Sequence, residues 1–249
     1  MNHPTGRSID LNCDVGEGMG QDARLIPLVS SANIACGAHA GSPSDMHEAI
    51  AIAREHGTAI GAHPGHRDRD HFGRREVSLS VNQATTLVCE QVSALEKIAG
   101  EPPHHIKLHG GLYHQVGRDR VLAEAVTSAL HTDWPQVVVV AMAGSVLVDV
   151  AQAEGLRVAK EAFIDRRYAS SGHLVSRSDA GGYISDALQA ANQAVRLVNE
   201  RSVRTADGGM LDVQADTLCI HGDGKNAVEI TKAVVTAFRR HTISVCSHV

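Results

Sequence analysis

Acidic residues, histidines and glycines cluster directly after short apolar runs in this chain of 249 residues. Six such clusters occur: residues 12–18 (NCDVGEG), 36–41 (CGAHAG), 61–65 (GAHPG), 107–113 (KLHGGLY), 161–167 (EAFIDRR) and 221–224 (HGDG). Carboxylates and imidazoles are the groups that carry general acid–base catalysis and bind metals. Glycines allow a ligand to approach the backbone closely. The pattern predicts one polar site assembled from distant segments.

Four histidines and one lysine stand out within these clusters. His39, His63, His109 and His221 occupy equivalent places after their apolar runs. One histidine at a strand end is more often a hydrogen-bonded structural residue than a catalyst, but four in equivalent places favour a functional site. Lys107 lies inside an apolar run, and a buried lysine is costly unless it is paired. We therefore expect Lys107 to be functional or ion-paired.

Charged residues near the clusters allow two interpretations each. Asp14 and Glu17 are candidates for acid–base chemistry, although Asp14 could cap a loop and Glu17 could be solvated. Arg74 and Arg75 either clamp a carboxylate or a phosphate from a loop or form an ordinary surface pair. The residue types alone leave both interpretations open.

The elements that must position these side chains alternate along the chain. Strand-like apolar runs cover residues 9–13, 32–36, 58–62, 106–108, 137–142, 157–163, 217–220 and 242–246. Helix-like amphipathic segments cover residues 44–55, 80–98, 122–130, 145–154, 184–199 and 227–240, with Ser44 as the expected N-cap of the first. Residues 201–213 are polar, contain a turn signal and are expected to form a small excursion.

Alternating strands and helices predict a parallel α/β fold. The number of units in a chain of this length favours a β/α barrel, with an open doubly wound sheet as the alternative. In both folds the carboxyl ends of the strands share one rim, so the six clusters should converge there. No linker divides the chain, so residues 1–249 are expected to form a single domain.

Composition excludes several classes of protein. Lys and Arg total 23 and Asp and Glu total 28, giving a net charge of −5 without a basic run, which argues against a nucleic-acid partner. The apolar runs are too short for a membrane span, and residues 1–8 lack a signal-peptide core, so we expect a cytoplasmic protein. The five cysteines form no CxxC pair, which argues against a disulfide framework or zinc knuckle. Aromatic residues make up only 3%, so the core must be filled by Val, Ala, Leu and Ile, which suits a closed barrel of small branched side chains.

The six clusters, together with residues 72–75 (FGRR), resemble the motifs of the LamB/YcsF family, which provides the A subunit of bacterial 5-oxoprolinase. The similarity runs in family order from about residue 10 to residue 223. The chain departs from the family pattern at Leu108, Gly111, His114 and Ile164, which bears on substrate preference more than on reaction class. The resemblance implies an irregular seven-stranded β/α barrel of the glycoside hydrolase/deacetylase type.

The resemblance also implies ATP-dependent opening of 5-oxoproline to L-glutamate, with ADP and phosphate released, together with partner subunits B and C. ATP can activate the stable lactam by phosphorylating its amide oxygen before water attacks. No standard phosphate-binding loop occurs, since residues 222–225 (GDGK) lack the earlier glycine. Any nucleotide would therefore bind in another way.

The reaction assigns expected roles to the candidate residues. The first candidates for catalysis are Asp14, His39, His63, Lys107 and His109. Candidates for holding substrate, ATP or Mg²⁺ are Glu17, Arg74, Arg75, Glu161, Arg166, His221 and Asp223. The arginines suit anionic groups, Lys107 suits a transferring phosphoryl group, and the carboxylates suit a proton or Mg²⁺.

Two other functions remain open at this point. Deacetylases of the same fold type hold a divalent metal with one aspartate and two histidines, and Asp14, His39 and His63 could form such a set. Alternatively, the chain could bind lactam without catalysis and present it to its partners.

Overall fold

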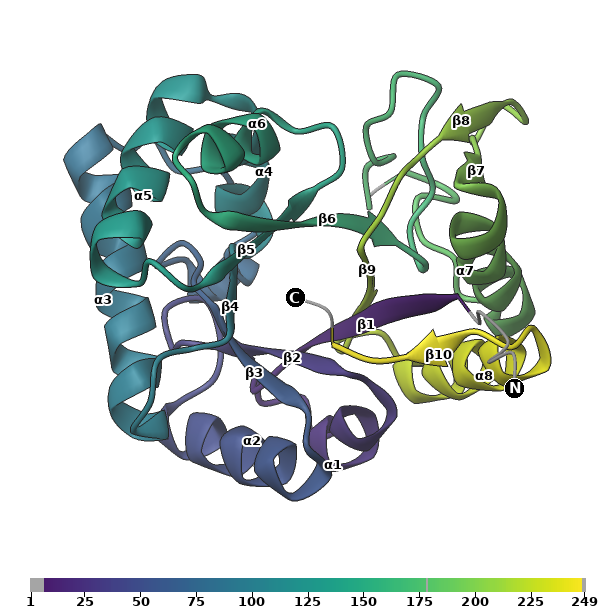
Figure 1. Cartoon of the computed structure of the whole chain (residues 1–249), viewed down its shortest axis with the longest axis horizontal. Helices are drawn as coiled ribbons and strands as arrows, with labels where there is room; N and C mark the ends of the chain where they lie inside the picture. The colour runs from purple at the N-terminus through teal and green to yellow at the C-terminus, as the bar shows by residue number, and fades with distance from the viewer. Residues whose placement is uncertain (1–6, 178, 248–249) are drawn as a thin grey trace, which may run out of the picture.

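Seven parallel strands close into a barrel in the computed structural model, which describes residues 7–177 and 179–247. In barrel order they are β1 (Ser8–Val15), β2 (Ser31–Ala35), β3 (Ala59–His63), β4 (His105–Lys107), β5 (Val138–Met142), β6 (Arg157–Phe163) and β9 (Thr217–His221). Strand β9 pairs with both β6 and β1, which closes the ring (Figure 1). The predicted barrel is therefore confirmed, and the open sheet is wrong.

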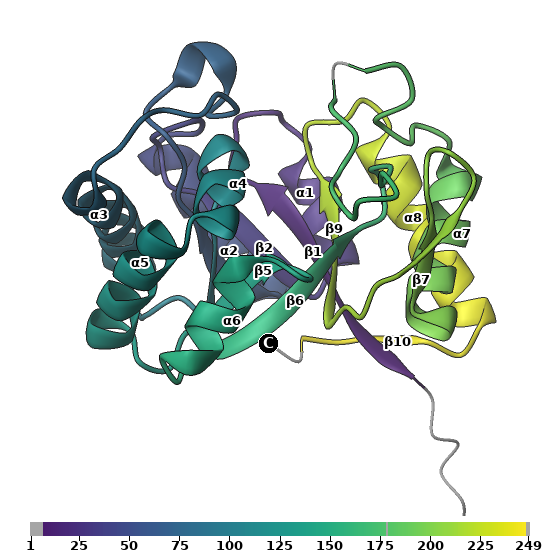
Figure 2. The ribbon, with the colours of Figure 1, turned by 90° about the horizontal axis from the view of Figure 1, so that it is seen from above.

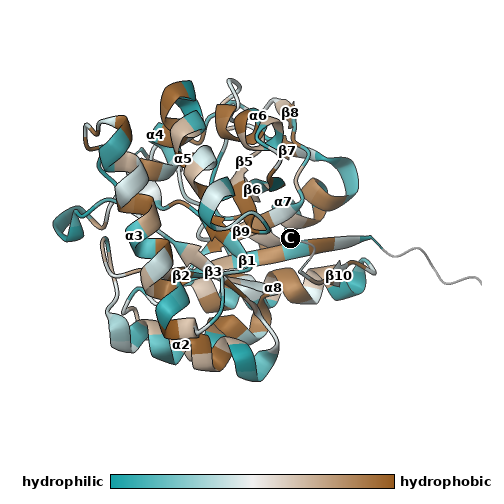
Figure 3. Cartoon of the chain, turned by 60° about the vertical axis from the view of Figure 1, so that its left-hand side comes forward, coloured by the Kyte–Doolittle hydropathy of each residue, from teal (hydrophilic) through white to brown (hydrophobic). Residues whose placement is uncertain are grey.

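Helices surround the barrel, as the two perpendicular views show (Figures 1 and 2). The α-helices of the described residues are α1 (Asp22–Leu25), α2 (Pro43–His56), α3 (Val81–Ala99), α4 (Gly110–Arg118), α5 (Arg120–Asp133), α6 (Val146–Ala153), α7 (Ala187–Glu200) and α8 (Ala227–Arg240). Two short 3₁₀ turns, η1 (Ile26–Leu28) and η2 (Arg69–His71), complete the helical elements. The helices carry mixed polar and apolar residues, as their amphipathic patterns predict (Figure 3).

Three local details differ from the sequence-based expectations. Ser42, rather than Ser44, caps α2, because its hydroxyl accepts from the backbone N–H of Asp45 and a proline follows at the first helical position. Helix α4 has no counterpart among the predicted helices, since the glycines at its start obscure the pattern. The last predicted strand shortens to β10 (Ser244–Val245), which extends the sheet beside β1 outside the closed ring.

The polar segment between α7 and β9 forms a small excursion, as expected. Strands β7 (Ser202–Arg204) and β8 (Met210–Asp212) pair antiparallel as a separate hairpin. No helix in the described part of the chain is long and apolar enough to cross a membrane. Residues 1–6, part of the segment on which the cytoplasmic prediction rests, lie outside the described residues.

The expected core of Val, Ala, Leu and Ile side chains is present, but polar side chains share the barrel interior with the apolar cluster of Val138, Val140 and Ala159. Side chains of Asn12, Asn33, His105, Lys107 and Glu161 meet across the interior by hydrogen bonds and ion pairs between strands that are not all neighbours. Most apolar side chains of the same strands belong to the layer shared with the helices, whereas Ala159 packs inside the barrel against Val138 and Val140. Every second residue of a strand points to the same face, so the polar set and the apolar set alternate.

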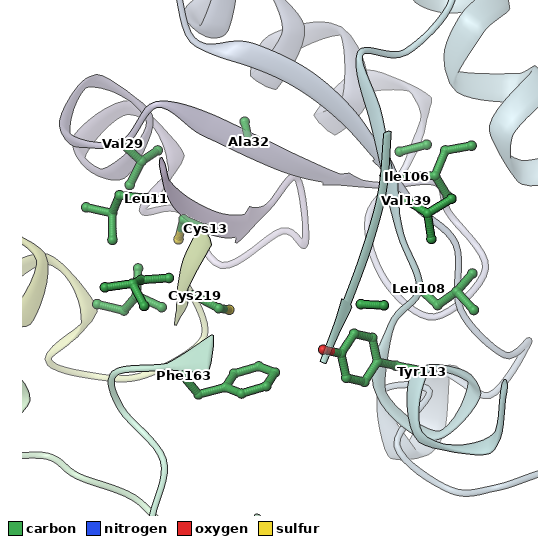
Figure 4. Packing of buried hydrophobic residues seen from close by; sticks show 14 of the residues in the cluster. Leu11, Cys13, Val29, Ala32, Ile106, Leu108, Tyr113, Val139, Phe163 and Cys219 are labelled. Carbon is green, nitrogen blue, oxygen red and sulfur yellow. The ribbon is translucent and has the colours of Figure 1, made fainter. Parts of the chain in front are cut away.

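The apolar core therefore lies mainly between the strands and the helices. Figure 4 shows Leu11 beside Val29 in one part of this layer and Ile106 beside Val139 in another. Burial of this layer is the main force that stabilises the barrel and leaves its interior available for polar groups. Cys13, Cys36, Cys89 and Cys219 are free thiols.

Candidate active site

A deep pocket of about 1310 Å³ opens at the carboxyl ends of the strands. Its floor contains Asp14, His63, Lys107, Glu161 and His221, which come from five different strands. Helix α4 and the loops around residues 143–149 and 166–177 form its walls. The predicted convergence of distant clusters on one rim is thus what the structure shows.

Lys107 occupies the centre of this floor and is nearly inaccessible to solvent. Its ammonium group lies 3.0 Å from Asp14 Oδ1 and 2.8 Å from Glu161 Oε1. It also reaches Asn12 Oδ1 at 3.2 Å and Cys219 Sγ at 3.0 Å. Burial would lower the pKa of Lys107, but the charge of Asp14 and its other partners raise it well above its usual range. Because an ammonium group has three protons, Lys107 is saturated and holds the two carboxylates in place.

The two carboxylates bound to Lys107 differ in the contacts that their second oxygen atoms make. Glu161 also accepts from Asn12 Nδ2 at 3.1 Å and from the hydroxyl of Tyr113 at 2.7 Å. Asp14 accepts from Asn33 at 2.9 Å, and its second oxygen lies 3.4 Å from His63 Nε2. Burial would raise the pKa of Asp14, but His63 and Lys107 hold it well below its usual range. Asp14 is therefore an ionised carboxylate at the pocket floor.

Three of the four predicted histidines gather beside Asp14. His39 and His109 stack with ring centroids 3.8 Å apart, and His63 meets both rings edge-on. The distance from His109 Nδ1 to His63 Nε2 is 3.0 Å. Burial and the charge of His63 lower the pKa of His39 to about 3, and burial with neighbouring histidines lowers the pKa of His109 well below its usual range. His39 and His109 are neutral at physiological pH.

Glu17 lies against this histidine group rather than in solvent. Its Oε1 atom is 3.5 Å from His39 Nε2 and 3.7 Å from His109 Nδ1. Burial, followed by the charge of Asp14, raises the pKa of Glu17 well above its usual range. Its Oε1 has no hydrogen-bond partner, and neither ring nitrogen of His39 has one. The group is thus a buried set of donors and acceptors with unused bonding capacity.

The fourth histidine, His221, forms a separate dyad with Asp165. Its Nδ1 lies 2.9 Å from Asp165 Oδ2 and 3.0 Å from Oδ1, and its backbone N–H donates to the same carboxylate. Burial would raise the pKa of Asp165, but the charge of His221 and these hydrogen bonds hold it below its usual range. A carboxylate accepts only, so Nδ1 carries the proton and Nε2 is left free. An imidazole held in this way is suited to act as a general base.

The predicted arginines occupy different environments. Arg74 pairs with Asp223 and lies over the ring of Phe72, with 4.8 Å from its guanidinium carbon to the ring centroid. Arg75 lines the pocket and remains largely exposed, with a 3.4 Å contact to Asp68. Arg166 is buried and donates to the backbone oxygens of Val175 and Gly182, so it organises the wall formed by this loop.

The metal set Asp14, His39 and His63 needs revision on geometric grounds. His39 and His63 group with Glu17 and His109, whereas Asp14 groups with Cys219 and His221. Among the described residues, neither group of three or more potential ligands consists of oxygen atoms alone. Mg²⁺ prefers oxygen ligands, so these residues do not form a dedicated magnesium cage.

Several residues of the site are absent from the sequence-based candidates. Asn12 and Tyr113 anchor Glu161, and Asp165 orients His221. Arg177 lines the pocket and lies 3.5 Å from Asp223. The alternation of residues 10, 12 and 14 with apolar neighbours is a signal for Asn12, whereas nothing local in the sequence marks Arg177.

Comparisons with known proteins agree with this architecture. The model of the LamB/YcsF family matches residues 9–249. The A subunit of 5-oxoprolinase from Staphylococcus carnosus is 42% identical over 245 residues, covering 95% of this chain and 97% of that protein. The crystal structure of a lactam utilization protein from Thermus thermophilus superposes with a TM-score of 0.88 at 44% identity, covering 96% of this chain and 99% of that one. The peptidoglycan deacetylase PdaC from Bacillus subtilis shares the fold, with a TM-score of 0.54 at 10% identity over 99% of this chain and 90% of that one.

Proposed function

Since the chain belongs to the LamB/YcsF family, we propose that it is part of a cytoplasmic 5-oxoprolinase. In this proposal it opens the ring of 5-oxoproline to give L-glutamate, coupled to hydrolysis of ATP to ADP and phosphate, and it acts together with subunits B and C. The observation that carries the proposal is the buried array of Asp14, Lys107 and the His221–Asp165 dyad on the floor of one large pocket.

The chemistry of ring opening requires two waters. Transfer of the γ-phosphoryl group of ATP to the lactam oxygen gives ADP and an activated ring carbon. One water adds to that carbon, and cleavage of the carbon–nitrogen bond yields an amine and an acyl phosphate. A second water converts the acyl phosphate into the side-chain carboxylate and phosphate. The protein must accept a proton from each water, donate one to the leaving amine and hold anionic groups.

His221 is the residue of the pocket best suited to accept a proton from water. Its Nδ1 donates to Asp165, so the lone pair of Nε2 is available. Phe163 stacks against its ring with centroids 5.6 Å apart and restricts its rotation. General acid–base catalysis of this kind contributes about 10²–10⁴ in rate.

Lys107 is better suited to positioning than to contacting phosphate. All three of its protons are used by Asp14, Glu161 and neighbouring acceptors. Its charge keeps Asp14 ionised, and Asp14 then presents a carboxylate toward the position of the reacting ring. This assignment modifies the role expected for Lys107 and keeps Asp14 in contact with substrate.

The arginines at the pocket suit the anionic parts of the substrates. Arg75 is exposed in the pocket, and Arg74 lines the same pocket with its guanidinium group paired to Asp223. A guanidinium group binds a carboxylate or phosphate in bidentate fashion. Mg²⁺ would arrive with the phosphates of ATP, for which one or two carboxylates suffice.

The test is glutamate release from 5-oxoproline with ATP and Mg²⁺, comparing this chain alone, subunits B and C alone, and all three together. The proposal predicts turnover only in the complete mixture, with one ADP formed per glutamate. Turnover by B and C without this chain, at the rate of the full mixture, would contradict it.

A further inference from the structure

The unusual feature is a pair of histidine nitrogens that face each other although the other nitrogen of each ring already faces a backbone carbonyl. His63 Nδ1 lies 2.7 Å from the backbone oxygen of Lys107, and His109 Nε2 lies 2.9 Å from that of Phe72. A carbonyl oxygen only accepts, so both of these ring nitrogens carry their protons. In the neutral rings, His63 Nε2 and His109 Nδ1 are then both lone pairs, and they lie 3.0 Å apart.

Two lone pairs at this distance repel unless a positive centre lies between or beside them. A proton on His63 Nε2 would satisfy this pair and could also face Asp14 Oδ2 at 3.4 Å. It would leave Glu17 Oε1 and both ring nitrogens of His39 buried without partners. Buried polar atoms without partners are costly, so a single proton does not account for the arrangement.

We propose that Glu17, His39, His63 and His109 bind a divalent transition-metal ion of the Zn²⁺ type. Each ligand belongs to a different one of four consecutive barrel strands or to the loop after it. One atom from each of the four residues lies within 4.8 Å of the others. Three nitrogens and one carboxylate oxygen form a donor set that suits Zn²⁺ and its neighbours rather than Mg²⁺ or Ca²⁺.

The separations fit such an ion. Ligand atoms about 2.0–2.1 Å from a tetrahedral ion lie about 3.3–3.4 Å apart. The pairs measured here are 3.0 Å for His63 Nε2 to His109 Nδ1, 3.5 Å for His39 Nε2 to Glu17 Oε1 and 3.7 Å for His109 Nδ1 to Glu17 Oε1. These three pairs match the edges of such a tetrahedron within a few tenths of an ångström. The ring of His39, which stacks parallel to His109, must also turn for its nitrogen to face the same ion.

The surroundings also resemble a prepared metal site. Metal-bound histidines usually donate their second N–H to a carbonyl or carboxylate, which fixes the tautomer. His63 and His109 already do so through Lys107 and Phe72. Because His63 and His109 line the pocket, the ion would lie in the pocket wall. This assignment is independent of the reaction proposed above.

The test uses untagged full-length protein, stripped with chelator and then freed of it. Titration with Zn²⁺ and with Co²⁺, followed by calorimetry and by the visible spectrum of bound cobalt, is expected to show one tight site with tetrahedral bands. Excess Mg²⁺ should leave it occupied. His39→Ala and Glu17→Gln should each weaken Zn²⁺ binding at least about 100-fold. His66→Asn is the matched control, because His66 is also buried but lies outside the cluster.

Stoichiometric binding by the folded wild-type protein and by His66→Asn, lost in the two cluster variants, supports the site. Failure of the folded wild-type protein to bind either ion at micromolar concentration would overturn it. Equal affinity in Glu17→Gln and in the wild type would overturn the ligand set. If a variant does not fold, the NMR signals of the imidazole nitrogens in the wild-type protein test the ligand set instead. Zn²⁺ must then shift the signals of three histidines together.

Discussion

Lys107 Nζ lies 2.8 Å from Glu161 Oε1, although strand β5 separates the strands that carry them. The contact therefore crosses the barrel interior and links separate parts of its floor. Together with Asp14, this ion pair places two carboxylates and one ammonium group where solvent does not reach. Stability and chemistry depend here on the same few side chains.

Removing the positive charge should be strongly destabilising. Lys107→Met leaves Asp14 and Glu161 buried without their counter-ion, and the loss of one partner of a buried ion pair costs about 3–5 kcal/mol. Urea unfolding measures the free energy of unfolding. The control Lys97→Met, on the outer helix α3, should change it by less than about 0.5 kcal/mol.

Neutralising the acids should then restore part of this loss. Lys107→Met combined with Asp14→Asn and Glu161→Gln removes all three charges and should unfold at higher urea concentration than Lys107→Met alone. A loss below about 1 kcal/mol in Lys107→Met would contradict the description of this floor as a saturated ionic network.

The His221–Asp165 dyad gives a kinetic prediction. Asp165→Asn replaces an acceptor by an amide that can donate to Nδ1, which favours the wrong tautomer of His221. In the assembled enzyme kcat should fall at least about 100-fold while KM changes little. Asp133→Asn, at the exposed end of α5, is the control. Unchanged kcat in Asp165→Asn would remove His221 from the role of base.

The same carboxylate predicts the acid sensitivity of the fold. Because the pKa of Asp165 is lower in the folded chain than its ordinary value of 3.8, the unfolded state binds a proton first as pH falls. Its contribution to stability is complete above about pH 5 and is lost as pH falls through the lowered pKa. The free energy of unfolding of Asp165→Asn should therefore decline less steeply below about pH 5 than that of the wild type. Parallel curves would contradict this.

Binding of the anionic substrates should depend on the arginines that line the pocket. A hydrogen bond to a charged group contributes about 1.5–3 kcal/mol, so Arg74→Ala should raise KM for 5-oxoproline or for ATP at least about tenfold. Arg67→Ala provides the control, since Arg67 pairs with Glu90 on the surface and does not line this pocket. Identical constants for both variants would place the anions elsewhere.

A glycine on β3 makes room for a buried histidine. A Cβ at Gly61 would clash with the ring of His105, whose Nε2 lies 2.9 Å from Asn33 Oδ1. Gly61→Ala should lower the free energy of unfolding by about 1–3 kcal/mol. Gly117→Ala, in helix α4 where a Cβ meets nothing closer than 3.8 Å, should be neutral or stabilising by up to about 1 kcal/mol.

The barrel and the convergence of its polar clusters can be predicted because strand ends carry a strong compositional signal. The polar interior is only partly predictable: the alternation of polar and apolar residues on β1 marks one polar face, but it does not show that this face lies inside the barrel. Helix α4 escapes prediction because Gly110 and Gly111 suppress helical propensity at its start.

Contacts between residues of the site depend on the three-dimensional arrangement, and no local sequence pattern predicts them. Asp165 contacts His221 and Lys107 contacts Cys219 across large sequence separations. Glu17, rather than Asp14, lies against His39 because the loop after β1 turns back toward β2. Such contacts follow from closure of the barrel. The sequence indicates the class of fold, but it does not indicate which side chains meet when the barrel closes.

Opening of the lactam ring in this pocket, within the complete enzyme, is tested most directly by the rate of glutamate release from 5-oxoproline and ATP. Subunits B and C are assembled either with the wild-type chain or with its His221→Asn variant. We expect turnover with the wild type and a loss of at least about 100-fold with the variant, in complexes of equal composition. Equal rates in both complexes would contradict a catalytic role for this pocket.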